Sequence, residues 1–147
     1  MKAVVSVDEI NEYLSAQGDF MSSGPIVVER ADPDDVLVRW TYDDSKTRPG
    51  GYIAGPTLFT IADLAGWVLV FATEGILPMA VTWDLHITFM RPAIGRDVVA
   101  RAKQLKRGRS LIYGDVTMYV DGAPDKPVAH ATVTYALPND SNVSSAP

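Results

Sequence analysis

The apolar segment 56–73 constrains the fold of this 147-residue chain more than any other feature. Pro56 suits the first turn of a helix, where its missing N–H costs nothing, and Gly75 suits the stop that follows the last turn. Apolar side chains cover most of the circumference of such a helix: Leu58, Phe59, Ile61, Leu64, Trp67, Val68, Val70 and Phe71. A helix that is apolar nearly all round is buried on most sides. The rest of the chain is therefore expected to wrap it.

Acidic residues argue against a membrane-spanning role for this segment. Asp63 and Glu74 divide the apolar stretch 58–81, and the uncharged run between them is far shorter than the ~18 residues that a span needs. Near the N-terminus, Asp8 and Glu9 interrupt the first apolar stretch too early for a secretory leader. We therefore expect a cytoplasmic protein without membrane contact.

The composition indicates one globular domain, because 47% of the residues are hydrophobic and 21% are charged. We expect this domain to span 1–138 and the Ser-, Asn- and Pro-rich segment 139–147 to form a flexible tail. A net charge of −5 argues against a nucleic-acid partner. The absence of cysteine excludes a disulfide framework, a thiolate nucleophile and a thiolate metal site.

Local patterns predict the remaining elements. Residues 7–17 read as a short helix that Ser6 caps together with Glu9 and that Gly18 ends. Strands are predicted by alternation and by turn residues at 26–29, 36–42, 81–89, 97–105, 110–120 and 128–137. The last four strands are expected to form a meander, since short turns join them. This order predicts an α+β fold in which a curved antiparallel sheet of about six strands wraps the long helix.

Three stretches carry a resemblance to a known family: AGPTLFTIAD at 54–63, VTWDLHITFMRPA at 81–93 and KRGRS at 106–110. In this order and spacing they resemble the PaaI-like acyl-CoA thioesterases of the hotdog superfamily. The first is similar to the family's His-Gly-Gly helix start followed by an acid, the second to its central strand, and the third to the basic hairpin before its fifth strand. The resemblance covers roughly 36–137 and implies the hotdog fold.

The resemblance also implies roles for individual residues. Asp63 would be the general base or nucleophile, the Gly55 N–H would bind the carbonyl oxygen, and Thr82 would hold the attacking water. In a hotdog dimer the helix start and the facing acid come from different subunits, so a homodimer is implied, and we expect two dimers to associate. The family needs no cofactor beyond the coenzyme A of its acyl-CoA substrate.

Two departures from the family leave alternatives open. Ala54 stands where the family has His, and Arg48 stands where Asn is common. Pro56 also replaces the second glycine. A non-catalytic protein that binds acyl-CoA or another acyl ligand is therefore the second hypothesis. A hotdog hydratase or dehydratase ranks last, because that chemistry usually needs a His and an acid together, and no His follows the helix acid Asp63 at the Asp-x-x-x-x-His spacing.

Further residues are candidates for substrate binding. Tyr52 and Trp67 are placed to line an acyl pocket, although tryptophan in such a helix is commonly a core residue. Arg107 and Arg109 either contact the phosphates of coenzyme A or are ordinary charges of a hairpin turn.

His86 has two readings. It either forms a structural pair with Asp84 on one face of its strand or replaces the missing family histidine in the pocket. Asp63, Asp84 and His86 lack the close spacing of zinc or iron ligands, so no metal site is expected.

Overall fold

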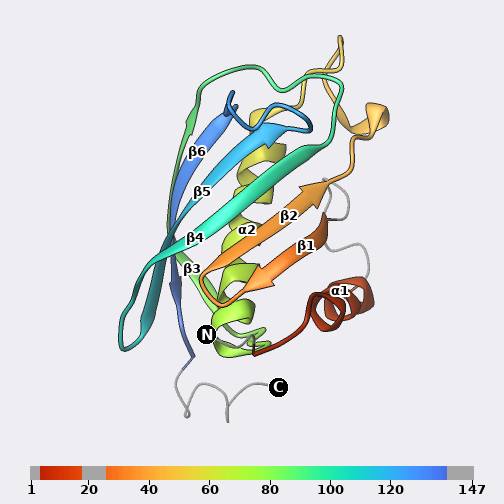
Figure 1. Ribbon diagram of the computed structural model, residues 1–147. Coiled ribbons are helices and arrows are strands. Elements are labelled where there is room, and N and C mark those ends of the chain that lie inside the picture. Colours follow the sequence, from red (N-terminus) through yellow and green to blue (C-terminus); the bar gives the residue numbers. More distant parts are fainter. Residues whose placement is uncertain (1–3, 18–25, 139–147) are drawn as a thin grey trace.

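The computed structural model describes residues 4–17 and 26–138 and contains two α-helices and six strands within them (Figure 1). The elements follow the chain as α1 (Val7–Ala16), β1 (Ile26–Asp32), β2 (Asp35–Trp40), a short 3₁₀ helix (Asp44–Lys46), α2 (Gly55–Glu74), β3 (Val81–Phe89), β4 (Val98–Arg107), β5 (Leu111–Val120) and β6 (Ala129–Ala136). Every predicted helix and strand is present. Gly18, the predicted stop of the first helix, and the predicted tail 139–147 lie outside the described residues.

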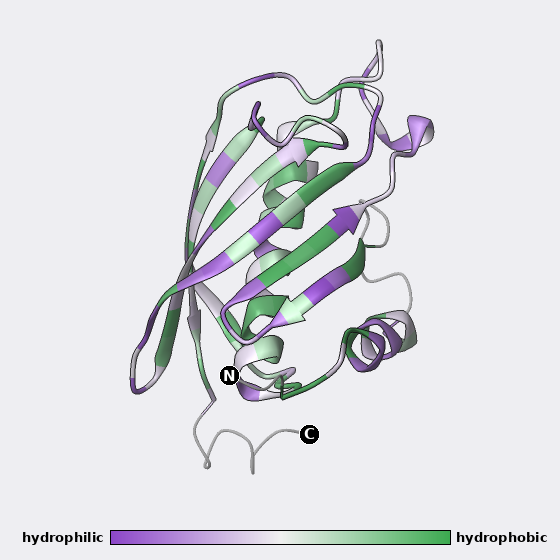
Figure 2. Cartoon of the chain, viewed as in Figure 1, coloured by the Kyte–Doolittle hydropathy of each residue, from purple (hydrophilic) through white to green (hydrophobic). Residues whose placement is uncertain are grey.

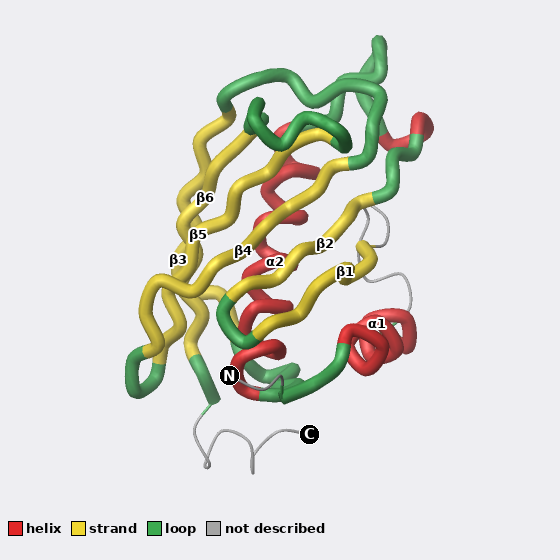
Figure 3. The backbone as a smooth tube through the Cα atoms, in the orientation of Figure 1, coloured by secondary structure: helices red, strands yellow, loops and turns green. Residues whose placement is uncertain are grey.

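The six strands form one antiparallel sheet in the order β1-β2-β4-β5-β6-β3, and the sheet curves round α2 (Figure 1). The predicted four-strand meander is wrong, because β3 pairs with β6 and not with β4. The reason is the connection 90–97, which crosses one end of the sheet (Figure 3). It is tied to the loop before α2 by hydrogen bonds from the Ile53 N–H to the Ala93 oxygen and from the Gly95 N–H to the Gly51 oxygen.

The core lies between the inner face of the sheet and α2. Along β6 the buried residues Ala129, Ala131, Val133 and Tyr135 alternate with more exposed ones, and Figure 2 shows this alternation of hydropathy on the neighbouring strands. Helix α2 is long and apolar enough to cross a membrane, but 67% of its most apolar stretch is buried inside the protein. It is the core helix that the sequence predicts.

Helix α1 covers one edge of the sheet. Its predicted capping box is present, since the Glu9 N–H donates to Ser6 Oγ over 3.1 Å and the Ser6 N–H donates to Glu9 Oε1 over 3.2 Å. The Asn11 amide then bonds the backbone of edge strand β1 twice, donating to the Val28 oxygen over 2.9 Å and accepting from the Val28 N–H over 2.8 Å. The β1 edge is therefore occupied, whereas β3 at the other edge is largely exposed.

Candidate active site

Helix α2 begins with an N-terminus that no side chain caps. Ala54 is the N-cap residue and has no side chain that could accept a hydrogen bond. Pro56 occupies the first turn, as predicted, and within the described residues the Gly55 N–H has no hydrogen-bond acceptor. This N–H lies at the positive end of the helix dipole, which favours a group that carries or develops negative charge.

Two cavities meet at Gly55. One of about 490 Å³ is lined in part by Arg48, Tyr52, Gly55 and Arg91. The structure thus brings two predicted substrate-binding residues, Arg48 and Tyr52, to the predicted oxyanion donor Gly55. The Arg91 guanidinium also donates to the Pro127 oxygen over 2.8 Å, which holds that side chain at the end of β3. This cavity thus combines two arginines with the open helix start.

The second cavity, of about 460 Å³, shares Gly55 with the first and is mainly apolar. Its lining includes Pro56, Phe59, Ile87 and Phe89. Phe89 lines both cavities, and its ring lies 3.4 Å from the position that a Cβ on Gly55 would occupy. A polar ligand group in one cavity and an apolar group in the other can therefore both reach the same helix start.

Asp63 lies a little over two helical turns further along α2 and is half-buried. Its Oδ1 atom accepts a hydrogen bond from Thr82 Oγ1 over 2.6 Å and lies 2.7 Å from the Tyr135 hydroxyl. The same hydroxyl lies 2.7 Å from the main-chain oxygen of Asp63. Two donors thus converge on one carboxylate oxygen, and within the described residues no hydrogen-bond partner contacts Oδ2.

A β-bulge turns Thr82 toward this carboxylate. The pairing of β3 with β6 shifts between Thr82 and Asp84, so Trp83 is an extra residue. Without the shift, strict alternation would place Thr82 on the same face as His86, opposite the inward-packed Leu85. The bulge instead re-aims the Thr82 side chain toward α2.

Tyr135 of β6 is a site residue that the sequence did not single out. Burial, the nearby Asp63 carboxylate and its hydrogen bond raise the pKa of Tyr135 above its ordinary value. The ring fits against α2 at Gly66, where a Cβ would stand 2.8 Å from Tyr135 Cε2. A glycine inside an otherwise unbroken apolar helix is the signal that could have pointed to a close neighbour.

Other predicted residues lie away from the cavities at the helix start. His86 and Asp84 are exposed on the outer face of β3, and the described residues show no hydrogen bond between them. Trp67 packs against Tyr13 and Phe71, with ring centroids 6.1 and 4.7 Å away. Within one protomer, none of these side chains reaches the Gly55 N–H.

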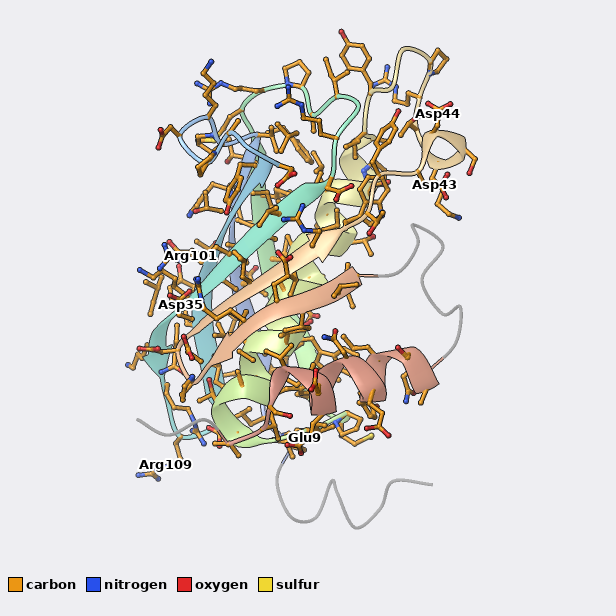
Figure 4. The ribbon with its side chains drawn as sticks, turned by 45° about the vertical axis from the view of Figure 1, so that its right-hand side comes forward. Glu9, Asp35, Asp43, Asp44, Arg101 and Arg109 are labelled. Atoms are coloured by element: carbon orange, nitrogen blue, oxygen red, sulfur yellow. The ribbon has the colours of Figure 1, made fainter. Side chains whose placement is uncertain are left out.

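The basic hairpin lies at the far end of α2. Its turn is shorter than predicted, since β4 runs to Arg107, and Arg107 pairs with Glu74 in the last turn of α2. Arg109 lies at the hairpin tip, at the opposite end of the molecule from Asp43 and Asp44 (Figure 4). A cavity of about 280 Å³ beside it is lined in part by Lys106 and Tyr113. Arg109 is therefore the more available of the two predicted phosphate contacts.

Among the described residues, no three His, Asp or Glu side chains are grouped closely enough to hold a metal ion. The chemistry available at the site is that of a held carboxylate, a hydroxyl and an open helix start. These three groups suit a base or nucleophile acting near a carbonyl whose oxygen gains negative charge.

Comparison with known proteins gives a consistent result. The family model described as the thioesterase superfamily matches residues 50–126. Human acyl-coenzyme A thioesterase 13 is 30% identical over 79% of this chain and 82% of its own length. A crystal structure of a proposed thioesterase from Silicibacter sp. TM1040 superposes with a TM-score of 0.83 at 32% identity and covers 95% of this chain and 96% of that one.

A more distant structure, from Streptococcus mutans UA159, was solved bound to acetyl CoA. It has a TM-score of 0.69 at 19% identity and covers 83% of this chain and 95% of its own, so its likeness concerns the fold. Together these neighbours share the hotdog arrangement of a curved sheet round one long helix.

Proposed function

The chain belongs to the thioesterase superfamily, and we propose that it hydrolyses acyl-CoA thioesters to a free acid and coenzyme A through Asp63, Thr82 and the Gly55 N–H. The observation that carries the proposal is the Asp63 carboxylate, whose Oδ1 receives donors from Thr82 and Tyr135 while Oδ2 remains available. The human relative named as an acyl-coenzyme A thioesterase supports the substrate class.

In the proposed reaction Asp63 Oδ2 takes a proton from a water molecule, whose oxygen attacks the thioester carbonyl carbon. The Thr82 hydroxyl donates a hydrogen bond to Asp63 Oδ1, so the lone pairs of Thr82 Oγ1 are left to accept a hydrogen bond from the water's second O–H. The Gly55 N–H stabilises the negative charge that develops on the carbonyl oxygen. The carbon–sulfur bond then breaks, and the leaving thiolate receives the proton from Asp63.

Asp63 acting as a nucleophile is the alternative route at the same site. Its Oδ2 would then attack the carbonyl carbon, and the carbon–sulfur bond would break to give a mixed anhydride and the coenzyme A thiolate. Water would then open the anhydride to the free acid and the Asp63 carboxylate, and the proton released would go to the thiolate. Single turnover in ¹⁸O-labelled water separates the two routes, because only the nucleophilic route can leave the label in the Asp63 carboxylate.

The site requires two subunits in this proposal. Gly55 and Asp63 of one helix are roughly 12 Å apart along the axis at about 1.5 Å per residue, too far to act on one carbonyl. The open edge strand β3 supports a two-fold dimer, since Val81, Trp83 and Phe89 there are 53%, 68% and 51% exposed. Antiparallel pairing of two β3 edges would bring Asp63 toward the partner's helix start.

Coenzyme A is proposed to lie along the basic residues near this composite site. Arg48 and Arg91 line the cavity at the helix start. Within one chain, Arg109 lies at the end of α2 that is far from the helix start. The two-fold operation of the proposed dimer would move the partner's hairpin toward the cavity at this chain's helix start. Guanidinium groups suit phosphate oxygens because of their forked donors. The acetyl CoA held by the Streptococcus mutans neighbour supports a ligand of this class.

A second function, acyl-CoA binding without hydrolysis, is favoured by one observation. Ala54 brings no polar group to the carbonyl beside Gly55. Release of free thiol from short, medium, long and aromatic acyl-CoAs separates the two functions, with calorimetric binding measured on the same protein. Turnover of one class above the enzyme-free rate supports hydrolysis, whereas binding without product over the whole panel would establish the second function and overturn the first.

A further inference from the structure

We propose that Tyr135 is a positioning residue that fixes the Asp63 carboxylate through its buried hydroxyl, so that Oδ2 and not Oδ1 faces the substrate. The role rests on the proposed function, because it acts through Asp63. Tyr135 lines neither of the two cavities at the helix start, so nothing places its hydroxyl against the substrate itself.

The hydroxyl contacts Asp63 at two points. It lies 2.7 Å from Oδ1 and 2.7 Å from the main-chain oxygen of the same residue. A group that contacts both the main chain and the carboxylate of one residue restricts the torsions between them. Thr82 also bonds Oδ1, but it lies on the exposed edge strand, whereas Tyr135 is only 5% exposed. Tyr135 is thus the more rigidly held of the two donors.

The position of the Tyr135 ring is set by α2. A Cβ on Gly66 would stand 2.8 Å from Tyr135 Cε2 and 3.0 Å from Val133 Cγ2, so glycine is the residue that admits both β6 side chains. A Gly within a helix is less stable there than Ala, and the close approach of β6 gives a structural reason for this glycine. The ring therefore has little freedom to move its hydroxyl away from Asp63.

The hydroxyl also remains a donor near neutral pH. Burial and the Asp63 carboxylate both favour the protonated phenol, which raises the pKa of Tyr135. A hydroxyl that keeps its proton can donate to a carboxylate throughout the pH range in which that carboxylate acts as a base.

Steady-state kinetics of Tyr135→Phe test the inference on the best acyl-CoA of the panel. We expect kcat to fall about tenfold or more with KM within twofold, because misplacing a reacting group affects the chemical step. Tyr119→Phe is the matched control and should keep both constants, because it removes a hydroxyl from a β5 residue that lines a different cavity, of about 240 Å³, together with Arg101 and Lys103. A fall in kcat of less than threefold, or a change in KM alone, overturns the inference.

The same change in an Asp63→Asn background separates positioning from a loss of folding. If Tyr135 acts through Asp63, the double variant should be no slower than Asp63→Asn, whereas a damaged fold would slow it further. Gly66→Ala provides a second route, since it keeps the hydroxyl but displaces the ring, and should lower kcat at constant KM. Full activity of Asp63→Asn would overturn the proposed function. If Asp63→Asn loses activity but Tyr135→Phe turns over at the wild-type rate, only this inference is overturned.

Discussion

Thr82 Oγ1 lies 2.6 Å from Asp63 Oδ1, although an unbroken β3 strand would turn Thr82 to the outer face of the sheet. The extra residue at Trp83 makes the contact possible, because it shifts the pairing with β6 between Thr82 and Asp84. The strand keeps Leu85 and Ile87 against the core and still delivers a hydroxyl to the helix. The bulge thus allows β3 to pack against the core and to place the Thr82 hydroxyl against Asp63.

Replacing Thr82 with Val should lower kcat roughly tenfold or more. Valine has a similar shape but cannot donate to Asp63 Oδ1 or accept from a water molecule, so both proposed contributions of the hydroxyl are lost. The measurement is acyl-CoA thiol release at saturating substrate. Thr88→Val, on the outer face of the same strand, should retain wild-type turnover, and equal rates for both variants would remove Thr82 from the mechanism.

A charge placed on the open β3 edge should dissociate the proposed dimer, and thioesterase activity should be lost in the same variant. Trp83 is 68% exposed on β3, so Trp83→Lys would leave a charge between two paired edges. Light scattering should give a mass of at least twice 15.9 kDa for the wild type and 15.9 kDa for the variant. Val27→Lys on the opposite edge strand serves as the control. A fully active monomer would contradict the shared site.

Asp35 should stabilise the fold above pH 4 and lose this effect as the pH falls. The hydrogen bond from Arg101 is the largest cause that lowers the pKa of Asp35 from 3.8 to about 2, and with the bond from Arg30 it outweighs the opposing effect of burial. Figure 4 shows Asp35 beside Arg101. Because the folded-state pKa is the lower one, the stabilisation is present above the unfolded value and disappears as the pH falls through about 2.

Urea unfolding of the wild type and of Asp35→Asn at several pH values tests the direction of this pH dependence. After allowance for solvent screening, the two free energies of unfolding should differ by about 1–2 kcal/mol at pH 7, and the difference should shrink below pH 4. Asp125→Asn, in the exposed β5–β6 turn, should cost little at either pH. A difference for Asp35→Asn that stays constant down to pH 2 would contradict the assignment.

The sequence predicted the elements well because their signals are local. The all-round apolar pattern and the Pro56 and Gly75 boundaries define α2, and Ser6 with Glu9 defines the start of α1. Which strand β3 would pair with was not predictable in this way, because it depends on where the connection 90–97 is anchored. Short turns favour neighbouring strands, and here a longer connection leads across the sheet.

The candidate site was predictable in part. The resemblance named Asp63, Gly55 and Thr82, and the structure brings Thr82 to Asp63 while Gly55 opens onto two cavities. Tyr135 was missed because a tyrosine at a buried strand position follows the same alternation as a core residue. The bulge at Trp83 was missed because tertiary packing, and not local sequence, decides where a strand takes up an extra residue.

The most direct test of the central claim is the turnover number of Asp63→Asn on the best acyl-CoA substrate, measured beside Asp84→Asn. Asparagine keeps the shape of Asp63 but is neither a base nor a nucleophile, so kcat should fall by roughly 100-fold or more while the thermal midpoint stays close to wild type. Asp84 is exposed on the outer face of β3, and its variant should turn over normally. Turnover of a folded Asp63→Asn at the wild-type rate would contradict the account.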